Sequence, residues 1–341
     1  MTVQAGVIGL GRAGWQIHVA QLARMQAFKV AAVADPMQER LDEAAATLGC
    51  RTYTDAYALT TDPELDLVVV ASPNHTHVPY AMAALKAGKH VIVDKPVATR
   101  LADMDALMAE AKRGGRTLAP FHSRRFDGDF VKIRKIIDSG VLGPLHMVKI
   151  YNHGFSRRND WQTLRRMGGG QLTNWGSHAL DKALTLLNWE VDKVFGDMTT
   201  TVCAGDAEDQ VKVVLKGKNG LLIDVEVAGG CALPQAPWVI MGKYGTLTGT
   251  HALLEWKYYD PSALPPVQIK EDPGRSYDFS EQIPWQTCSC ETGGMGESHA
   301  LWYAHFAAAW KSGGPMPTTA QQARHLIAIQ DEVRRQSREE V

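Results

Sequence analysis

The sequence predicts an α/β chain of two domains: a doubly wound parallel sheet, followed by an α+β domain with a large, mostly antiparallel open sheet. Its 341 residues are more than one ordinary domain needs and suit two. Short apolar runs alternate with helical stretches up to Phe121, whereas strand signals crowd together later in the chain. We therefore expect the first domain to span residues 1–121 and the second to span residues 122–341.

Five β-branched runs predict the parallel strands of the first domain. The runs are apolar throughout rather than alternating, as expected for strands that helices cover on both faces. Gly49 and Gly88 stand where helices should end, and Thr99 can cap a helix over Arg100–Lys112. The predicted strands are Ala5–Gly9, Val30–Ala34, Leu67–Ala71, His90–Val93 and Thr117–Phe121.

The second domain carries a different pattern. A helix over Asp129–Asp138 should lead into a long strand, and the last two predicted strands are joined by a hairpin signal at Gly217–Gly220. Residues Asp260–Gly296 are rich in Pro, Ser and Gly and predict loops. Two terminal helices should begin at Glu297 and Thr319 and could pack back on the first domain. The predicted strands are Leu145–Asn152, Val194–Val202, Gln210–Lys216 and Leu221–Val227.

The composition narrows the range of partners. With 45% hydrophobic and 21% charged residues and a formal net charge of -1, the chain has no polyanion-binding character, and we expect no nucleic acid partner. No signal-peptide pattern opens the chain and no apolar run approaches a membrane span, so we expect a cytoplasmic protein with no membrane partner. The five scattered cysteines suit reduced thiols, and because Cys288 and Cys290 fit no common zinc spacing we expect no metal.

A glycine loop follows the first predicted strand and opens a helix, which is the context of a dinucleotide-binding turn. The first glycine permits a tight turn, the second lets the backbone approach a pyrophosphate, and the third lets helix and strand pack closely. Unpaired N–H groups at the helix N-terminus can hold the phosphates. The predicted cofactor-binding residues of this loop are Gly9, Gly11, Arg12, Ala13 and Gly14.

An acidic residue, Asp35, ends the second strand about 20 residues after the loop, where a carboxylate can accept hydrogen bonds from the adenosine ribose hydroxyls. The same carboxylate would repel a ribose 2'-phosphate by roughly 1 to 4 kcal/mol at about 4 Å, which favours NAD over NADP. Arg12 and Arg40 could supply compensating charge, so NADP stays as the alternative cofactor.

Residues Asp66–Ala98 read DLVVVASPNHTHVPYAMAALKAGKHVIVDKPVA, and with the glycine loop they closely resemble the Gfo/Idh/MocA family of sugar and polyol oxidoreductases. The resemblance implies a Rossmann domain whose fourth strand ends in a Pro-Asn turn near the cofactor. It also implies that the lysine of Asp94-Lys95-Pro96 serves substrate and nicotinamide, with Asp94 in place of the usual Glu and a cis bond before Pro96. The cofactor-binding set therefore also includes Ser72, Pro73, Asn74, His77, Asp94 and Lys95.

Lys95 stands at the carboxyl end of a predicted parallel strand, where ligands of doubly wound sheets bind. Its ammonium group can hydrogen-bond a reacting hydroxyl. Desolvation beside a cationic ring should lower its pKa and let it share in proton transfer. Lys95 is therefore a predicted catalytic residue, and the competing interpretation is a surface lysine that follows a strand.

The segment Gly168–Asp181 resembles the glycine-rich run that precedes a helix in the family, and it aligns His178 with the usual catalytic histidine. If the segment is helical, Asn174 and His178 stand one turn apart on the same face and can both point into the interdomain cleft. Neutral His178 can take the proton of a secondary hydroxyl, although a satisfied core histidine is the alternative. Asn174 stands where many members have Asp, and its amide can orient a hydroxyl but cannot hold a charge.

Five further residues are candidates for substrate binding. His122 and Arg124 follow the last strand of the first domain, where the chain crosses into the cleft, but an interdomain hydrogen-bonding role explains them equally well. His153, Arg157 and Trp161 lie in a loop that could cover the cleft and recognise hydroxyls or an anionic group. An exposed polar loop explains these three almost as well.

Taken together, these residues and the family resemblance predict an NAD(P)-dependent oxidoreductase that exchanges hydride between nicotinamide and a secondary alcohol or ketone, and the resemblance implies that the substrate is a sugar, inositol or related polyol. Two alternatives stay open: redox-neutral NAD-dependent glycoside cleavage or epimerisation, and a non-catalytic dinucleotide-binding sensor. A sensor has no need of the proton-transfer pair Lys95 and His178. We expect a homodimer or homotetramer, because one face of the large sheet must be covered.

Overall fold

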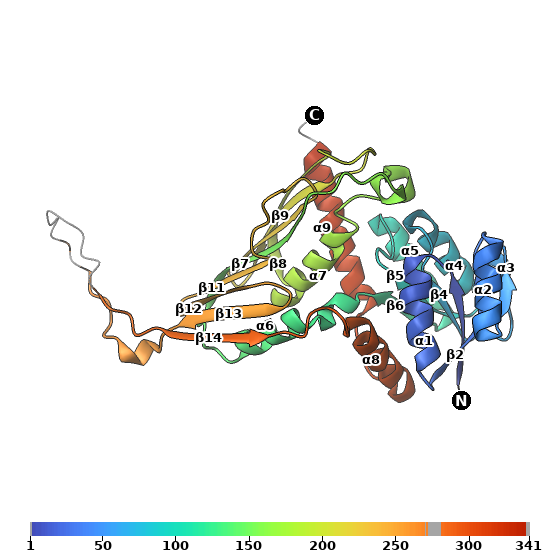
Figure 1. Ribbon diagram of the computed structural model, residues 1–341, viewed down its shortest axis with the longest axis horizontal. Helices are drawn as coiled ribbons and strands as arrows, with labels where there is room; N and C mark the ends of the chain where they lie inside the picture. Colours follow the sequence, from blue (N-terminus) through green and yellow to red (C-terminus); the bar gives the residue numbers. More distant parts are fainter. Residues whose placement is uncertain (1, 270, 272–280, 339–341) are drawn as a thin grey trace.

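The computed structural model describes residues 2–269, 271 and 281–338, and the strands of this part of the chain form two sheets. The first sheet has six strands and the second has eight. The two sheets lie at opposite ends of an elongated molecule, with helices between and around them (Figure 1).

The first sheet is parallel and doubly wound, as predicted. Its strands are β1 (Val3–Ile8), β2 (Phe28–Ala34), β3 (Arg51–Tyr53), β4 (Leu67–Val70), β5 (His90–Asp94) and β6 (Leu118–Phe121). They stand in the order β3-β2-β1-β4-β5-β6, and every neighbouring pair is parallel. The winding reverses between β1 and β4, and sheets of this kind bind ligands outside the carboxyl ends of the strands at that point.

Helices cover both faces of the first sheet, as its continuously apolar strands require. One face packs against α3 (Ala56–Thr60), α4 (His77–Lys86), α5 (Leu101–Gly114) and α9 (Ala320–Arg338). The other face packs against α1 (Ala20–Arg24), α2 (Gln38–Leu48) and α8 (Ser298–Ser312). Since α8 and α9 return to a sheet whose last strand ends at Phe121, the domain division at residue 121 stays a prediction.

The second sheet is open and mostly antiparallel, which confirms the predicted fold class. Its strands are β7 (Leu145–His153), β8 (Val191–Thr199), β9 (Gln210–Gly217), β10 (Leu222–Ala228), β11 (Trp238–Gly242), β12 (Gly245–Gly249), β13 (Leu253–Tyr258) and β14 (Gln286–Glu291). Their order is β14-β13-β12-β11-β7-β10-β9-β8. Only the pair β7 and β10 is parallel among these described strands.

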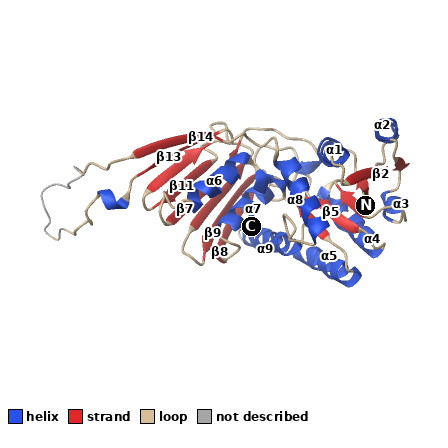
Figure 2. Cartoon of the chain, turned by 90° about the horizontal axis from the view of Figure 1, so that it is seen from below, coloured by secondary structure: helices blue, strands red, loops and turns tan. Residues whose placement is uncertain are grey.

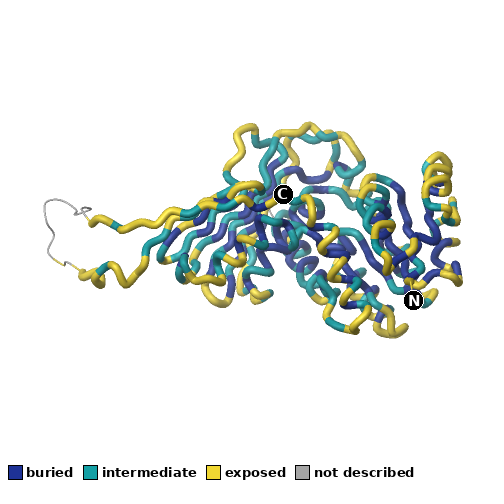
Figure 3. The backbone as a smooth tube through the Cα atoms, turned by 60° about the horizontal axis from the view of Figure 1, so that its bottom comes forward, coloured by how far each residue is buried: buried dark blue, intermediate teal, exposed yellow. Residues whose placement is uncertain are grey.

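The second sheet has one covered face and one open face. The covered face packs against α6 (Gly128–Asp138), α7 (Trp175–Leu186) and part of α9 (Figure 2). Along β9 buried and half-buried side chains alternate, and the half-buried ones belong to the open face. Residues 259–269 lead away from the sheet beyond β13 and are mostly exposed (Figure 3).

Several strands differ from the sequence prediction. The third strand, β3, was not predicted because it has three residues and is mostly exposed, so it shows no apolar run. The eighth strand, β8, begins three residues earlier than predicted, and β11, β12 and β13 were not predicted. The predicted loop Asp260–Gly296 contains β14, a polar edge strand that has no apolar pattern. Part of that range, residues 270 and 272–280, lies outside the described residues.

Three further features concern the described part of the chain. None of its helices combines the length and the apolar character that crossing a membrane requires. All five cysteines are free thiols. No three His, Cys, Asp or Glu side chains of the described residues come together as a metal-binding group.

Candidate active site

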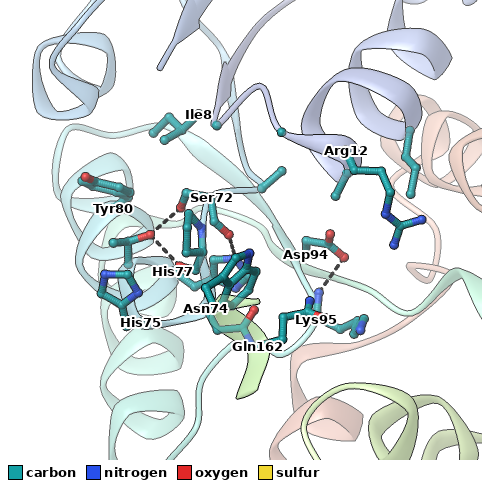
Figure 4. A pocket seen from close by; sticks show the side chains of 18 of the residues that line it. Ile8, Arg12, Ser72, Asn74, His75, His77, Tyr80, Asp94, Lys95 and Gln162 are labelled. Atoms are coloured by element: carbon teal, nitrogen blue, oxygen red, sulfur yellow. Dashed lines mark hydrogen bonds between the residues drawn. The ribbon is translucent and has the colours of Figure 1, made fainter. Parts of the chain in front are cut away.

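A cavity of about 930 Å³ lies at the carboxyl ends of the first sheet, where they face the second domain. The first domain supplies the glycine loop and the turns after β2, β4 and β5. The second domain supplies residues from the segment 158–162 and the start of α7, and His299 of α8 completes the lining. Asp94, Lys95 and Gln162 are among the residues that line the cavity, and Lys95 lies near Gln162 (Figure 4). The predicted residues that line it are Gly9, Gly11, Arg12, Ala13, Asp35, Ser72, Pro73, Asn74, His77, Asp94, Lys95, Arg124, Trp161, Asn174 and His178.

Three predicted substrate-binding residues do not line this cavity. His122 is buried in the interior next to it, with 3% of its surface exposed. His153 belongs to β7, where its Nε2 lies 3.3 Å from a Glu226 carboxylate oxygen. Arg157 is exposed on the loop that follows β7. The neighbouring Arg158 reaches the cavity instead.

The glycine loop has the shape that a dinucleotide cradle needs. Gly9 has φ +89°, and a Cβ there would lie 2.7 Å from Ser72 Cα. A Cβ on Gly14 would lie 1.7 Å from the Gly9 carbonyl oxygen, so this glycine serves close packing and does not itself line the cavity. A Cβ on Gly11 would meet nothing within 4 Å, which leaves its backbone open to a ligand. The loop therefore fits a bound pyrophosphate.

Asp35 is held firmly at the end of β2, with 3% of its surface exposed. One carboxylate oxygen accepts the Leu10 backbone N–H at 2.7 Å, and the other accepts the Met37 N–H at 3.0 Å. Arg40 Nη1 lies 3.2 Å from the same carboxylate, and its own side chain is 41% exposed. Asp35 is thus tied to the glycine loop, and Arg40 is near enough to balance part of its charge.

The turn after β4 links the two domains. Asn74 Nδ2 donates to the Gly168 carbonyl at 2.8 Å, which joins this turn to the glycine-rich segment of the second domain. The buried His77 ring lies 2.7 Å from the Ser72 carbonyl on one side and 2.7 Å from the Pro96 carbonyl on the other. His77 therefore clamps the turns after β4 and β5 together, and the Lys95–Pro96 peptide bond in the second turn is cis, as the resemblance implied.

Lys95 reaches across the cavity to the second domain. Its Nζ donates to Asn174 Oδ1 at 2.7 Å and approaches the Asn174 carbonyl at 3.4 Å. Burial lowers the pKa of Lys95 to about 8; the negative charge of Asp94 opposes this fall, and the cations Arg12, Arg124 and Arg158 add to it. Both protonation states of this lysine are therefore within reach near neutral pH.

Asn174 does not lie within a helix, and in this respect the helical expectation was wrong. It is the N-cap residue of α7, which begins at Trp175, and its side chain caps no helical N–H group. Instead Oδ1 accepts from Lys95 and Nδ2 donates to Gln162 Oε1 at 3.2 Å. Gln162 Oε1 also accepts from Arg158 Nη2 at 2.5 Å. Because this oxygen can only accept hydrogen bonds, its neighbour at position 174 has to offer a donor, and the Asn174 amide does so.

His178 lies in the first turn of α7 and lines the same cavity. Burial lowers its pKa well below the ordinary value, and the positive charges of Lys95 and Arg124 act in the same direction. Its Nδ1 is buried without a hydrogen-bond partner among the described residues. The imidazole is therefore neutral at pH 7, which is the state in which a histidine can accept a proton.

Several cavity residues were missed by the sequence analysis, among them Trp175, Gln162 and His299. Trp175 and Gln162 stand close to predicted residues in the chain, but neither side chain carries a signal of its own. His299 comes from α8, and its Nδ1 lies 2.9 Å from Ser123 Oγ. Burial lowers the pKa of His299 to about 4, with Arg124 adding to the effect. Only the tertiary return of α8 to the first sheet brings this imidazole to the cavity.

Family models match most of the chain. Residues 3–122 match the GFO/IDH/MocA oxidoreductase family, NAD-binding Rossmann fold, and residues 130–248 match the GFO/IDH/MocA C-terminal domain.

Curated relatives and solved structures agree with these matches. The chain is 35% identical to a myo-inositol 2-dehydrogenase of Thermotoga maritima over 64% of this chain and 66% of that protein. It is 34% identical to inositol 2-dehydrogenase 2 of Saccharopolyspora erythraea over 67% of each. The chain thus spans about two thirds of the length of these relatives. In fold it is similar to an NAD-binding protein from Listeria innocua, with TM-score 0.85 and 24% identity over 100% of this chain and 96% of that one.

Proposed function

The chain belongs to the GFO/IDH/MocA oxidoreductase family, and from that premise we propose that it is an NAD-dependent dehydrogenase acting on CH–OH groups. Its substrate would be a secondary alcohol, or the corresponding ketone, of a sugar, inositol or related polyol. The observation that carries the proposal is the meeting of Lys95, Asn174 and His178 in the cavity that the glycine loop also lines.

The cofactor would be held by residues that the sequence analysis singled out. The glycine loop would take the pyrophosphate and Asp35 the adenosine ribose, while the turn at Asn74 and the residues Asp94 and Lys95 would lie beside the nicotinamide. When bound, nicotinamide supplies the hydride acceptor for oxidation and the hydride donor for reduction. NAD is favoured over NADP because Asp35 is fixed and buried, although the nearby Arg40 keeps the second cofactor possible.

Two side chains would handle the proton. Neutral His178 would accept the proton of the substrate hydroxyl during oxidation and return it during reduction. The Lys95 ammonium would donate a hydrogen bond to the same oxygen and stabilise its developing negative charge. Because Asn174 already accepts one N–H of Lys95, the direction of the ammonium group is set before substrate binds.

The remaining cavity residues suit a polyhydroxylated substrate. Trp161 and Trp175 offer flat apolar surfaces for sugar or cyclitol rings. Arg124 and Arg158 offer donors in a planar arrangement for hydroxyl or anionic oxygens. These contacts favour the class of substrate without selecting one member of it.

A spectrophotometric screen tests the proposal. Sugars, inositols and their keto forms are incubated with the protein and NAD or NADP, and nicotinamide reduction or oxidation is followed. We expect turnover of at least one polyol with NAD. Product formed with copurified cofactor and no net NADH would assign the redox-neutral reaction instead. Cofactor binding without any product would favour the sensor.

A further inference from the structure

A buried histidine behind the cavity takes no part in the chemistry proposed above. His18 lies in η1, a π-helical turn over Gly14–Val19, and its side chain is completely buried. Its Nδ1 lies 2.7 Å from the Tyr303 hydroxyl of α8, and its Nε2 lies 3.7 Å from Asp94 Oδ2 at the end of β5. The imidazole thus joins three elements that are far apart in the chain.

Packing alone does not account for a histidine at this position. The ring faces Phe121 with the ring centroids 4.5 Å apart, and Tyr303 itself packs edge-on against Trp302. A wholly apolar side chain would fill such an aromatic cluster without the cost of burying two ring nitrogens. The π-helical turn, a feature that often accompanies functional sites, sets the imidazole between a hydroxyl and a carboxylate.

The hydrogen bond with Tyr303 fits a hydrogen on either ring nitrogen, and the nearby carboxylate of Asp94, which can only accept, favours Nε2. Burial, together with the negative charge of Asp94, raises the pKa of Tyr303 well above its ordinary value, so the phenol keeps its proton. The Tyr303 O–H can then donate to Nδ1, and the hydrogen of a neutral imidazole stands on Nε2. That N–H faces Asp94.

We infer that Tyr303 and His18 form a positioning pair that orients the Asp94 carboxylate and, through it, Lys95. Asp94 Oδ1 accepts the Lys95 backbone N–H at 2.8 Å, so the carboxylate and the lysine backbone move together. The catalytic meaning of this inference rests on the proposed function, because Lys95 has its chemical role there.

The position of the Asp94 charge matters for Lys95. Burial is the largest influence on the lysine and lowers its pKa, whereas Asp94 is the charge that raises it again. A carboxylate free to rotate would change both this balance and the direction of the lysine side chain. The Lys95 N–H holds Oδ1 by a hydrogen bond, whereas His18 Nε2 lies 3.7 Å from Oδ2, close enough to attract this oxygen but too far for a hydrogen bond.

The inference gives helix α8, the helix before the last one, a place beside the cavity. His299, four residues before Tyr303 on the same face of α8, lines the cavity and contacts Ser123. Helix α8 therefore reaches the site at two successive turns, once at the cavity wall and once behind Asp94.

The substitution Tyr303→Phe tests the pair by removing one oxygen while keeping the ring. We expect kcat to fall roughly 3- to 30-fold, because the imidazole loses the donor that fixes its tautomer, while KM for NAD stays within about twofold. The matched control is Tyr151→Phe, which removes a hydroxyl that donates to Asp224 Oδ2 at 3.0 Å in the second sheet. A kcat in Tyr303→Phe equal to that of the control overturns the inference.

Two substitutions of His18 separate positioning from packing. Gln keeps an N–H near the position of Nε2, whereas Leu keeps only apolar volume. We expect His18→Gln to retain several-fold more kcat than His18→Leu when both are assayed well below their thermal unfolding temperatures. Equal losses in the two variants would assign His18 to packing.

A measurement without turnover separates this inference from the proposed function. The ¹⁵N resonances of the His18 imidazole are recorded in the cofactor-free protein and assigned by their loss in His18→Gln. They should show the hydrogen on Nε2. In Tyr303→Phe the resonances should shift toward values typical of a mixture of the two tautomers. A hydrogen on Nδ1 in the unsubstituted protein overturns the inference even if polyols are oxidised. Failure of every polyol in the screen would overturn the proposed function and leave the tautomer result standing.

Discussion

At the scale of single residues, Asn174 shows how an amide fits a position where the family resemblance led us to expect an acid. Gln162 Oε1 already accepts from Arg158 and needs further donors, and the Asn174 amide supplies one. A carboxylate at position 174 would place one of its oxygens next to Gln162 Oε1, and two acceptor oxygens repel each other. With an amide, Asp94 is the main carboxylate that raises the pKa of Lys95, and burial takes that pKa down to about 8.

The first prediction concerns the pH dependence of oxidation. Since the Lys95 ammonium is the form that stabilises the developing negative charge, kcat/KM should fall as the pH rises through about 8. A profile of kcat/KM between pH 6 and 10, in roughly half-unit steps, measures this alkaline limb, the decrease of kcat/KM above about pH 8. A rate that rises through pH 8 would mean that neutral Lys95 is the base and would contradict the assignment.

Two variants serve as controls for that limb. In Lys95→Arg the charge persists at all these pH values, so the limb should disappear even where the overall rate is lower. In Asn174→Asp a carboxylate faces the ammonium, which should raise the pKa of Lys95 and move the limb to higher pH.

The second prediction concerns the choice of cofactor. Asp35→Asn removes the charge beside the ribose and leaves Arg40 unbalanced, so the NADP/NAD ratio of kcat/KM should rise at least roughly tenfold. Parallel kinetics with both cofactors measure the ratio. An unchanged ratio would show that the carboxylate does not discriminate.

At the scale of elements, the glycine loop and the helix after it depend on two different kinds of glycine. Gly14→Ala should push the helix away from β1, because its Cβ would lie 1.7 Å from the Gly9 carbonyl oxygen, and should lower both Tm and cofactor affinity. Gly11→Ala meets no atom within 4 Å and should weaken NAD binding with little change in Tm. Thermal unfolding and NAD titration of both variants check this third prediction; equal Tm values would contradict it.

Elements with a strong pattern were predictable, and polar or short ones were not. The strands at Leu67–Val70 and His90–Asp94 are buried on both faces and give continuous apolar runs, so the sequence indicates them clearly. The edge strand β14 (Gln286–Glu291) pairs through its backbone and exposes most of its side chains, so its residue types carry no signal. The same limit applies to β3, another short edge strand.

At the scale of the whole molecule, the motifs that we propose to be catalytic could be recognised in the sequence, but the assembly of the cavity around them could not. Lys95 and His178 stand in motifs that the family resemblance marks. His299 and Tyr303 reach the site because α8 packs on the first sheet, through contacts between residues more than 150 positions apart. No local pattern in the sequence encodes such contacts.

The open face of the second sheet leads to the fourth prediction, a homodimer or homotetramer. Its half-buried side chains include the ion pairs of Lys212 with Asp224 and Glu226 and the apolar residue Val239. A second copy that covered this face would bury the apolar part. Light scattering after gel filtration should show an oligomer, and Val239→Glu should shift it toward the monomer. A monomeric unsubstituted protein would contradict the prediction.

The most direct test of the central claim compares cofactor binding with turnover in Lys95→Met and His178→Ala. Calorimetric titration gives the NAD affinity, and NADH formation with the best polyol of the screen gives kcat. We predict a Kd for NAD within about threefold of the unsubstituted protein and a loss of kcat of at least roughly 100-fold in each variant. Turnover at the unsubstituted rate in either variant would contradict the assignment of this cavity as the active site.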